Sequence, residues 1–177
     1  QETRRIARIV QKLLDFASSD LDGTQGTDVN KVILDTMTLI HYSLKKQQDI
    51  TITTDLEEGL PLAIMGPDEF KQTIINLVKN SIQAIQERGE ILIKTRNSTP
   101  DQTILVMIAD TGVGIKEGVI PRIFDPFFTT KHTGEGTGLG LSVVYGIISK
   151  YKGTIAVTSK EGEGTQIRLT IPVLANR

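Results

Sequence analysis

Residues 66–110 read GPDEFKQTIINLVKNSIQAIQERGEILIKTRNSTPDQTILVMIAD, and the order of their patterns decides the fold class. A proline and two acids at the start and Gly89 beyond the end predict a helix over residues 67–88, because these residue types favour helix termini. Two stretches rich in β-branched residues, 90–96 and 103–110, then predict two strands. A helix followed by two consecutive strands departs from the strict strand–helix alternation of doubly wound folds.

The helices and strands predicted on either side of this stretch also do not alternate regularly. The apolar spacing predicts two further helices, over 28–46 and 139–150, and four further strands, over 50–54, 62–65, 154–159 and 164–172. This order favours an α+β fold, a two-layer sandwich of a mixed β-sheet with helices on one face, preceded by one more helix.

That preceding helix is predicted over residues 1–19, where apolar residues recur at heptad-like positions. The polar stretch 20–27 contains two glycines and is interpreted as a linker, so the main domain is expected over 28–177. A helix this short is marginal in water by itself, so its apolar stripe needs a partner. Two partners remain open, the chain's own domain or a helix of another chain in a bundle.

The composition excludes several classes of protein. Lys and Arg number 20 against 21 Asp and Glu, so the net charge of −1 gives no reason to expect nucleic acid as a partner. The absence of cysteine among the 177 residues excludes disulfides, thiolate catalysis and zinc-thiolate sites. Apolar runs fall far short of the ~20 residues of a membrane span, and no signal peptide is visible. We expect a cytoplasmic location, with membrane anchoring of a longer parent protein left open.

Glycine is concentrated in one segment, since seven of the 16 glycines lie between residues 112 and 140. Its sequence GEGTGLGLS at 134–142 leads directly into a predicted helix, whose free N–H groups and positive dipole end suit phosphate. The segment matches neither the dinucleotide fingerprint nor the Walker A loop. A flexible surface loop is the alternative interpretation.

The helix at 67–88 carries a stripe of amides beside its apolar face, formed by Gln72, Asn76, Asn80 and Gln83. These four lie within roughly 80° of one another around the helix axis. Asn is a poor helix former, so two of them one turn apart need a reason. An amide oxygen can complete an Mg²⁺ octahedron whose other ligands are nucleotide phosphates and waters. An ordinary solvated face is the alternative.

Asp110 ends a predicted strand and opens the sequence DTGVG. A carboxylate at that place can accept a hydrogen bond from the exocyclic amine of adenine, and Gly112 and Gly114 would leave room for a flat ring. An aspartate that only caps a turn is an equally simple interpretation.

Five motifs occur in series, namely NLVKN at 76–80, DTGVGI at 110–115, IFDPFFTTK at 123–131, GEGTGLGL at 134–141 and GEGT at 162–165. Together they resemble the ATP-binding domain of a sensor histidine kinase, a member of the Bergerat-fold superfamily that also includes gyrase and mismatch-repair ATPases. The resemblance covers about residues 27–174. The FFTTK form is similar to the nitrogen-regulation type of kinase, and residues 2–19 resemble the second helix of the dimerisation hairpin that precedes this domain.

The resemblance implies ATP and Mg²⁺ as ligands. It assigns the metal to Asn80, support of the phosphates or metal to Asn76, the adenine amine to Asp110 and the γ-phosphate to Lys131, with Asn76 and Lys131 as catalytic residues. Backbone N–H groups from Gly136 to Gly140 would wrap the triphosphate. The full set of expected nucleotide-binding residues is Asn76, Asn80, Gln83, Asp110, Gly112, Gly114, Ile115, Lys131, Gly136, Thr137, Gly138, Leu139, Gly140 and Thr165.

The segment 116–138 is expected to form a lid over ATP, with Phe124, Phe127 and Phe128 as core anchors. Neither His41 nor His132 lies in a phospho-acceptor context, so the implied reaction is transfer of the γ-phosphate of ATP to a histidine outside this chain.

The expected partners are ATP or ADP, the histidine-bearing dimerisation helix of the full-length kinase, a response-regulator receiver domain and a second copy in a full-length homodimer. Three alternatives are an ATP hydrolase of the gyrase-like branch, a protein-serine kinase and a degenerate binding module. Against the hydrolase, Asn76 stands where that branch carries its glutamate base.

Overall fold

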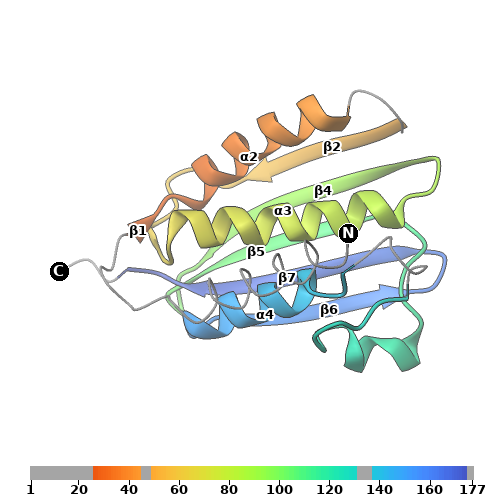
Figure 1. The fold of residues 1–177 in the computed structure, drawn as a ribbon. Coiled ribbons are helices and arrows are strands. Elements are labelled where there is room, and N and C mark those ends of the chain that lie inside the picture. Colours follow the sequence, from red (N-terminus) through yellow and green to blue (C-terminus); the bar gives the residue numbers. More distant parts are fainter. Residues whose placement is uncertain (1–25, 45–48, 131–136, 175–177) are drawn as a thin grey trace, which may run out of the picture.

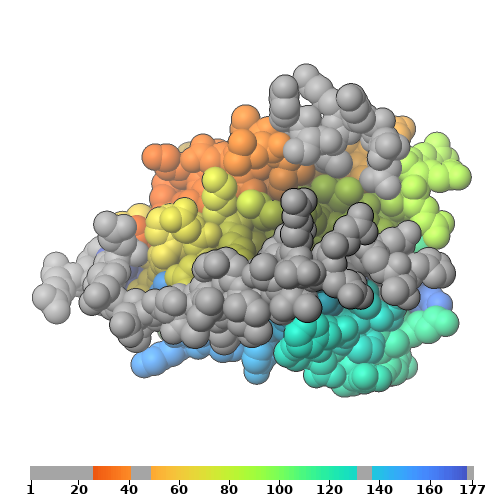
Figure 2. Space-filling view, viewed as in Figure 1, coloured from red at the N-terminus to blue at the C-terminus, as the bar shows by residue number. Residues whose placement is uncertain are grey.

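The computed structural model describes residues 26–44, 49–130 and 137–174. Within them, three α-helices cover one face of a five-stranded sheet (Figure 1). The helices are α2 (Val29–Leu44), α3 (Pro67–Ala84) and α4 (Gly140–Lys150), and the strands are β2 (Asp49–Leu56), β4 (Arg88–Ser98), β5 (Thr103–Asp110), β6 (Thr154–Lys160) and β7 (Gly164–Pro172). Figure 2 shows the helix-bearing side as a surface, with α2 in orange along one flank.

The sheet is mixed, in the order β2-β4-β5-β7-β6. β2 runs parallel to β4, and the chain crosses between them through α3. The other three pairings are antiparallel, and two of them are hairpins, β4–β5 and β6–β7. The α+β class and the two-layer arrangement predicted from the element order are therefore confirmed.

The core lies between the helices and the covered face of the sheet. Alternate residues of the central strands are buried there, as the two-residue period of a strand requires. They are Ile91 and Ile93 on β4, Ile104, Val106 and Ile108 on β5, and Ile167, Leu169 and Ile171 on β7. The facing side chains of α3 are also buried, among them Phe70, Ile74 and Leu77. This packing holds the central helix and strands as a rigid frame.

The central helix is shorter than its sequence pattern predicts. α3 ends at Ala84 instead of residue 88, because Ile85 is extended and the Val113 N–H takes the Ala84 carbonyl at 3.0 Å. Gly89 is not a helix stop but a residue of β4, where a side chain would meet the Thr111 hydroxyl. A loop distant in sequence therefore sets the end of this helix.

A second sheet of two short strands pairs β1 (Gly26–Thr27) with β3 (Ala63–Ile64). The stretch interpreted as a linker thus ends in a strand, because the Thr27 hydroxyl donates to the Met65 carbonyl and the backbone pairs with β3. The predicted helix over 1–19 and the rest of the linker lie outside the described residues.

A polar contact joins the start of α3 to the end of α4. The Lys150 ammonium lies 3.0 Å from one carboxylate oxygen of Glu69, and the Tyr151 hydroxyl donates to the other. Burial opposes the charge of Lys150, but the hydrogen bond and charge of Glu69 outweigh it and raise the pKa of Lys150. Burial and the Glu69 hydrogen bond raise the pKa of Tyr151. We call these three residues the interhelical clamp.

Candidate functional site

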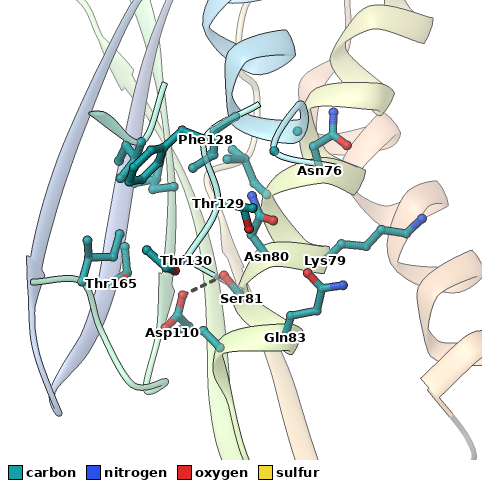
Figure 3. A pocket seen from close by; sticks show the side chains of 18 of the residues that line it. Asn76, Lys79, Asn80, Ser81, Gln83, Asp110, Phe128, Thr129, Thr130 and Thr165 are labelled. Atoms are coloured by element: carbon teal, nitrogen blue, oxygen red, sulfur yellow. Dashed lines mark hydrogen bonds between the residues drawn. The ribbon is translucent and has the colours of Figure 1, made fainter. Parts of the chain in front are cut away.

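A cavity of about 380 Å³ lies between α3, the paired ends of β5 and β7, and the segment that follows β5 (Figure 3). Its polar lining falls into two groups. We call Ser81, Asp110 and Thr165 the sheet end, and Asn76, Asn80 and Gly140 the helix end. The two groups differ in how their polar atoms are paired.

At the sheet end, Asp110 is held by two donors. The Ser81 hydroxyl donates to its Oδ2 at 2.8 Å, and the Gly112 N–H donates to its Oδ1 at 3.0 Å. Ser81 lies on α3 and is only 6% exposed. Figure 3 shows the two side chains pointing toward each other from the helix and the strand. The carboxylate is therefore oriented by the protein before any ligand binds.

Thr165 lies directly opposite Asp110 in the β5–β7 pairing. Its hydroxyl is 2.8 Å from the Ser159 hydroxyl at the end of β6. The same Ser159 oxygen accepts the Ile115 N–H at 2.9 Å and donates to the Gly164 carbonyl at 2.8 Å. One serine thus ties together the start of β7 and the loop that follows β5.

The two glycines after Asp110 serve backbone packing. A Cβ on Gly112 would lie 2.7–2.8 Å from atoms of Ala84, and one on Gly114 only 2.0 Å from the Lys160 carbonyl oxygen. Gly114 also has a φ of +69°, which side chains rarely adopt. We expected both glycines to make room for a ligand, but they make room for the chain itself, and only Gly114 also lines the cavity.

At the helix end, α3 presents its amides to the first turn of α4. A Cβ built on Gly140 would lie 3.8 Å from the Asn76 Oδ1 and 3.9 Å from the Asn80 Nδ2. The first N–H groups of an α-helix have no partner within the helix, and at α4 no side chain caps them. Amide side chains and helix N–H groups at one place suit an anion.

The wall opposite α3 comes from the segment after β5, which includes the 3₁₀ helix η1 (Glu117–Arg122). Ile123, which directly follows η1, is buried at 7% exposed, whereas Phe127 is 58% exposed. Phe124 packs on Tyr145 of α4, and Phe128 lines the cavity under the Arg122 guanidinium. The expectation of three core phenylalanines is wrong for Phe127, which is exposed and has a φ of +66°.

The cavity brings together most of the residues expected to bind a nucleotide. Ten of them line it: Asn76, Asn80, Gln83, Asp110, Gly114, Ile115, Thr137, Gly138, Gly140 and Thr165. Gly112 and Leu139 do not line it, since Gly112 packs on α3 and Leu139 is buried at the start of α4. Lys131 and Gly136 lie outside the described residues.

Sequence reasoning missed several lining residues, chiefly Ser81, Lys79, Thr129 and Thr130. For Ser81 a signal was present, because a serine occupies a position on the apolar face of the helix. A polar group at such a position needs a partner, which here is Asp110. Lys79 extends away from the sheet end in Figure 3.

A family model described as histidine kinase-, DNA gyrase B-, and HSP90-like ATPase matches residues 65–175, which contain every described residue that lines the cavity. The chain belongs to this ATPase family. The cavity therefore lies within the part of the chain that the ATPase family model matches.

Within the ATPase family, the chain is similar to sensor histidine kinases. It is 34% identical over 177 residues to the sensor histidine kinase ZraS of Escherichia coli (strain K12). It is 33% identical over 175 residues to the sporulation kinase E of Bacillus subtilis (strain 168). These alignments cover 100% and 99% of this chain but only 37% and 23% of the two relatives. The chain therefore spans a minor part of the length of these kinases.

A solved structure shows the same arrangement. The catalytic domain of histidine kinase ThkA, in a nucleotide-free form, has 29% sequence identity and a TM-score of 0.74, covering 84% of this chain and 95% of that one. The sequence and fold together group this ATPase domain with the catalytic domains of sensor histidine kinases. Among the described residues, no helix has the length and apolarity that crossing a membrane requires.

Proposed function

We propose that this domain binds ATP and transfers its γ-phosphate to a histidine side chain located outside residues 1–177, within a two-component sensor kinase. The single observation that carries the proposal is the division of the cavity. One end holds an oriented carboxylate, and the other combines amide side chains with an uncapped helix N-terminus.

The two ends fit the two parts of ATP. Asp110, which already accepts two hydrogen bonds, has lone pairs left for the exocyclic amine of adenine. The N-terminus of α4 and the backbone from Thr137 to Gly140 meet the phosphates with N–H groups, which attract negative charge. We propose that Lys131 adds a cation near the γ-phosphate and that Gly136 belongs to the same backbone wrap, as the resemblance implies.

The residues present also fit a magnesium ion that comes with the nucleotide. No group of three or more His, Cys, Asp or Glu in the described part of the chain could hold a metal without help. Asn80 at the helix end offers one amide oxygen, which suits an ion whose remaining ligands are phosphate oxygens and waters. When bound, Mg²⁺ neutralises phosphate charge, while Asn76 and Asn80 hold the phosphates in place.

Phosphotransfer is favoured over hydrolysis because none of the described residues at the helix end is an acid or a histidine. Asp110 is the one titratable acid among the described lining residues, and it is committed to the sheet end. Activation of water needs a base within hydrogen-bond reach, whereas an acceptor histidine brings its own nucleophilic nitrogen. The hydrolase and the serine kinase remain the alternatives that an assay must separate from this function.

The surroundings of the domain follow from the same proposal. Residues 1–19 would form the second helix of a dimerisation hairpin, 20–25 would link it to the domain, and FFTTK at 127–131 would mark the nitrogen-regulation type. The partners would be the histidine-bearing helix of the full-length kinase, a second copy in its homodimer, and the receiver domain of a response regulator. A cytoplasmic location suits a domain that uses ATP.

A transfer assay tests this function. The chain is mixed with Mg-ATP labelled at the γ-phosphate and with the separately prepared histidine hairpin of its parent protein. We expect label on the hairpin, in an acid-labile and base-stable linkage, and none on this chain alone. An acid-stable linkage on the hairpin would instead support a serine kinase, and free phosphate without labelled hairpin would support a hydrolase.

A further inference from the structure

The protons at the sheet end of the cavity can be counted one by one. Ser81 has one hydroxyl proton, and it is directed to the Asp110 carboxylate. Asp110, as a carboxylate, can only accept, and it already accepts from Ser81 and from the Gly112 N–H. Neither side chain therefore has a proton to give to a ligand.

The direction of the Thr165 hydroxyl proton depends on Ser159, a residue that does not line the cavity. Ser159 directs its single proton to the Gly164 carbonyl and accepts the Ile115 N–H. Its contact with the Thr165 hydroxyl can then exist only if Thr165 is the donor. The Thr165 proton is thus turned away from the cavity, and its oxygen is left as an acceptor.

Three nearby backbone donors are paired in the same way. The Gly112 N–H goes to Asp110, the Val113 N–H to the Ala84 carbonyl at 3.0 Å, and the Ile115 N–H to Ser159. These bonds keep three N–H groups of the loop after β5 from facing a ligand. The three side chains of the sheet end consequently present acceptors alone.

We propose that Ser81 and Ser159 are positioning residues that leave Asp110 and Thr165 as hydrogen-bond acceptors toward the cavity. In this way they select a base with an exocyclic amino group over one with an oxo group. The inference rests on the proposed binding of ATP. An amino group meets oriented acceptors, whereas an oxo group brings its lone pairs against Asp110 and Thr165 and finds no donor among the side chains of the sheet end. The oxo base loses the hydrogen bond that the amino group makes and also meets a repulsive contact, and both effects favour the amino base.

Calorimetric titration of the chain with ADP and with inosine diphosphate, which carries a 6-oxo group, tests the proposal. In Ser159→Ala, Thr165 can turn its proton into the cavity, so ADP affinity falls about fivefold and the preference for ADP falls at least as much. In Ser81→Ala, ADP affinity also falls about fivefold, because Asp110 loses one of its donors, while inosine diphosphate affinity stays unchanged.

Two variants distinguish the orientation of hydroxyl groups in the cavity from a general loss of stability. Thr73→Val removes another buried hydroxyl of α3, one that bonds the Glu69 carbonyl and does not line the cavity, so the preference for ADP stays as in the wild type. Ser159→Thr keeps the hydroxyl and restores the preference. If Ser159→Ala does not fold, Ser159→Cys, a weak hydrogen-bond partner of similar size, gives the same comparison.

A preference that stays within about twofold of wild type in the folded serine variants overturns the inference and leaves ATP binding standing. A wild-type chain that binds neither nucleotide overturns the proposed function instead. A lost preference in Thr73→Val as well assigns the effect to the stability of α3 and also overturns the inference.

Discussion

The two ends of the cavity are built on opposite principles. At the sheet end, Asp110, Ser81 and Thr165 are bonded to other groups of the chain before a ligand arrives. At the helix end, α4 starts without a side-chain cap, and the amides of Asn76 and Asn80 face its first turn. The side chains of the first end are paired within the protein, and the helix N-terminus of the second end has no side-chain cap.

This difference implies that the sheet end is suited to distinguish between bases and the helix end to attract phosphate charge. Paired and oriented groups discriminate between bases, because a wrong group leaves them unsatisfied. Unpaired N–H groups and amides discriminate little but attract any phosphate that reaches them. Substitutions at the sheet end should therefore change which nucleotide binds, and substitutions at the helix end should change how strongly phosphates and metal contribute.

The largest effect is expected for Asp110→Asn. The change replaces an acceptor with an amide that can donate toward the base, and it removes the charge that Ser81 and Gly112 stabilise. Affinity for ATP and ADP should fall by about 100-fold or more, as titration calorimetry would measure. The melting temperature should stay within about 5 °C of wild type, and an unchanged affinity would remove Asp110 from the site.

A smaller and metal-dependent effect is expected for Asn80→Ala. Removal of the amide oxygen should lower ATP affinity about tenfold with Mg²⁺ present and far less in EDTA. Gln72→Ala is the matched control, because Gln72 is exposed on the same stripe of α3 and does not line the cavity. Equal losses with and without Mg²⁺, or an equal loss in the control, would contradict the metal assignment.

Gly138→Ala tests the close contact between the backbone before α4 and Phe127, in the segment that forms the wall opposite α3. Gly138 has a φ of +64°, and a Cβ there would lie 2.4 Å from the Phe127 carbonyl carbon. The strain should displace the backbone that precedes α4 and lower ATP affinity about fivefold. Gly118→Ala, where a Cβ would meet open space, should bind ATP as the wild type does.

The smallest effect is expected at the interhelical clamp, on the far ends of the two helices that form the helix end. Glu69→Gln should lower the free energy of unfolding by about 1 kcal/mol at pH 7, since the Glu69 and Lys150 side chains are 25% and 22% exposed. Titration calorimetry should show ATP affinity close to that of the wild type.

The clamp also predicts a pH dependence. Lys150 and Tyr151 have pKa values raised above 10.5 and 10.0, so the stability they contribute is present below pH 10 and is lost as the pH rises through the raised values. Melting curves of wild type and Glu69→Gln should therefore converge above pH 10. Curves that stay parallel would show that the clamp does not titrate with folding.

Local patterns predicted the frame of the molecule well. Periodicity located α3, β5 and β7, and Pro67 with the two acids after it marked the start of α3. The unusual amides and the strand-end acid pointed to Asn76, Asn80 and Asp110. These features depend on neighbouring residues in the sequence or on residue types that are unusual in their element. Both kinds of signal can be read from one sequence.

Features made by distant contacts were not predictable. α3 stops at Ala84 because Val113 bonds its carbonyl, and no residue near position 84 signals that contact. The Ile115–Ser159 bond joins residues 44 apart, so the role of Ser159 becomes visible only in three dimensions. The positive φ of the exposed Phe127 was likewise not predictable, because its residue type disfavours that backbone conformation.

The pairing of Asp110 with Thr165 has a consequence for how the molecule assembles. Each residue ends up in a different hairpin, β4–β5 or β6–β7, and each hairpin closes through a short turn of its own. Hairpins form in microseconds, whereas joining two of them across a long intervening chain is slower. The sheet end exists only after β5 pairs with β7, so nucleotide binding at this end requires that pairing and draws the folding equilibrium toward it.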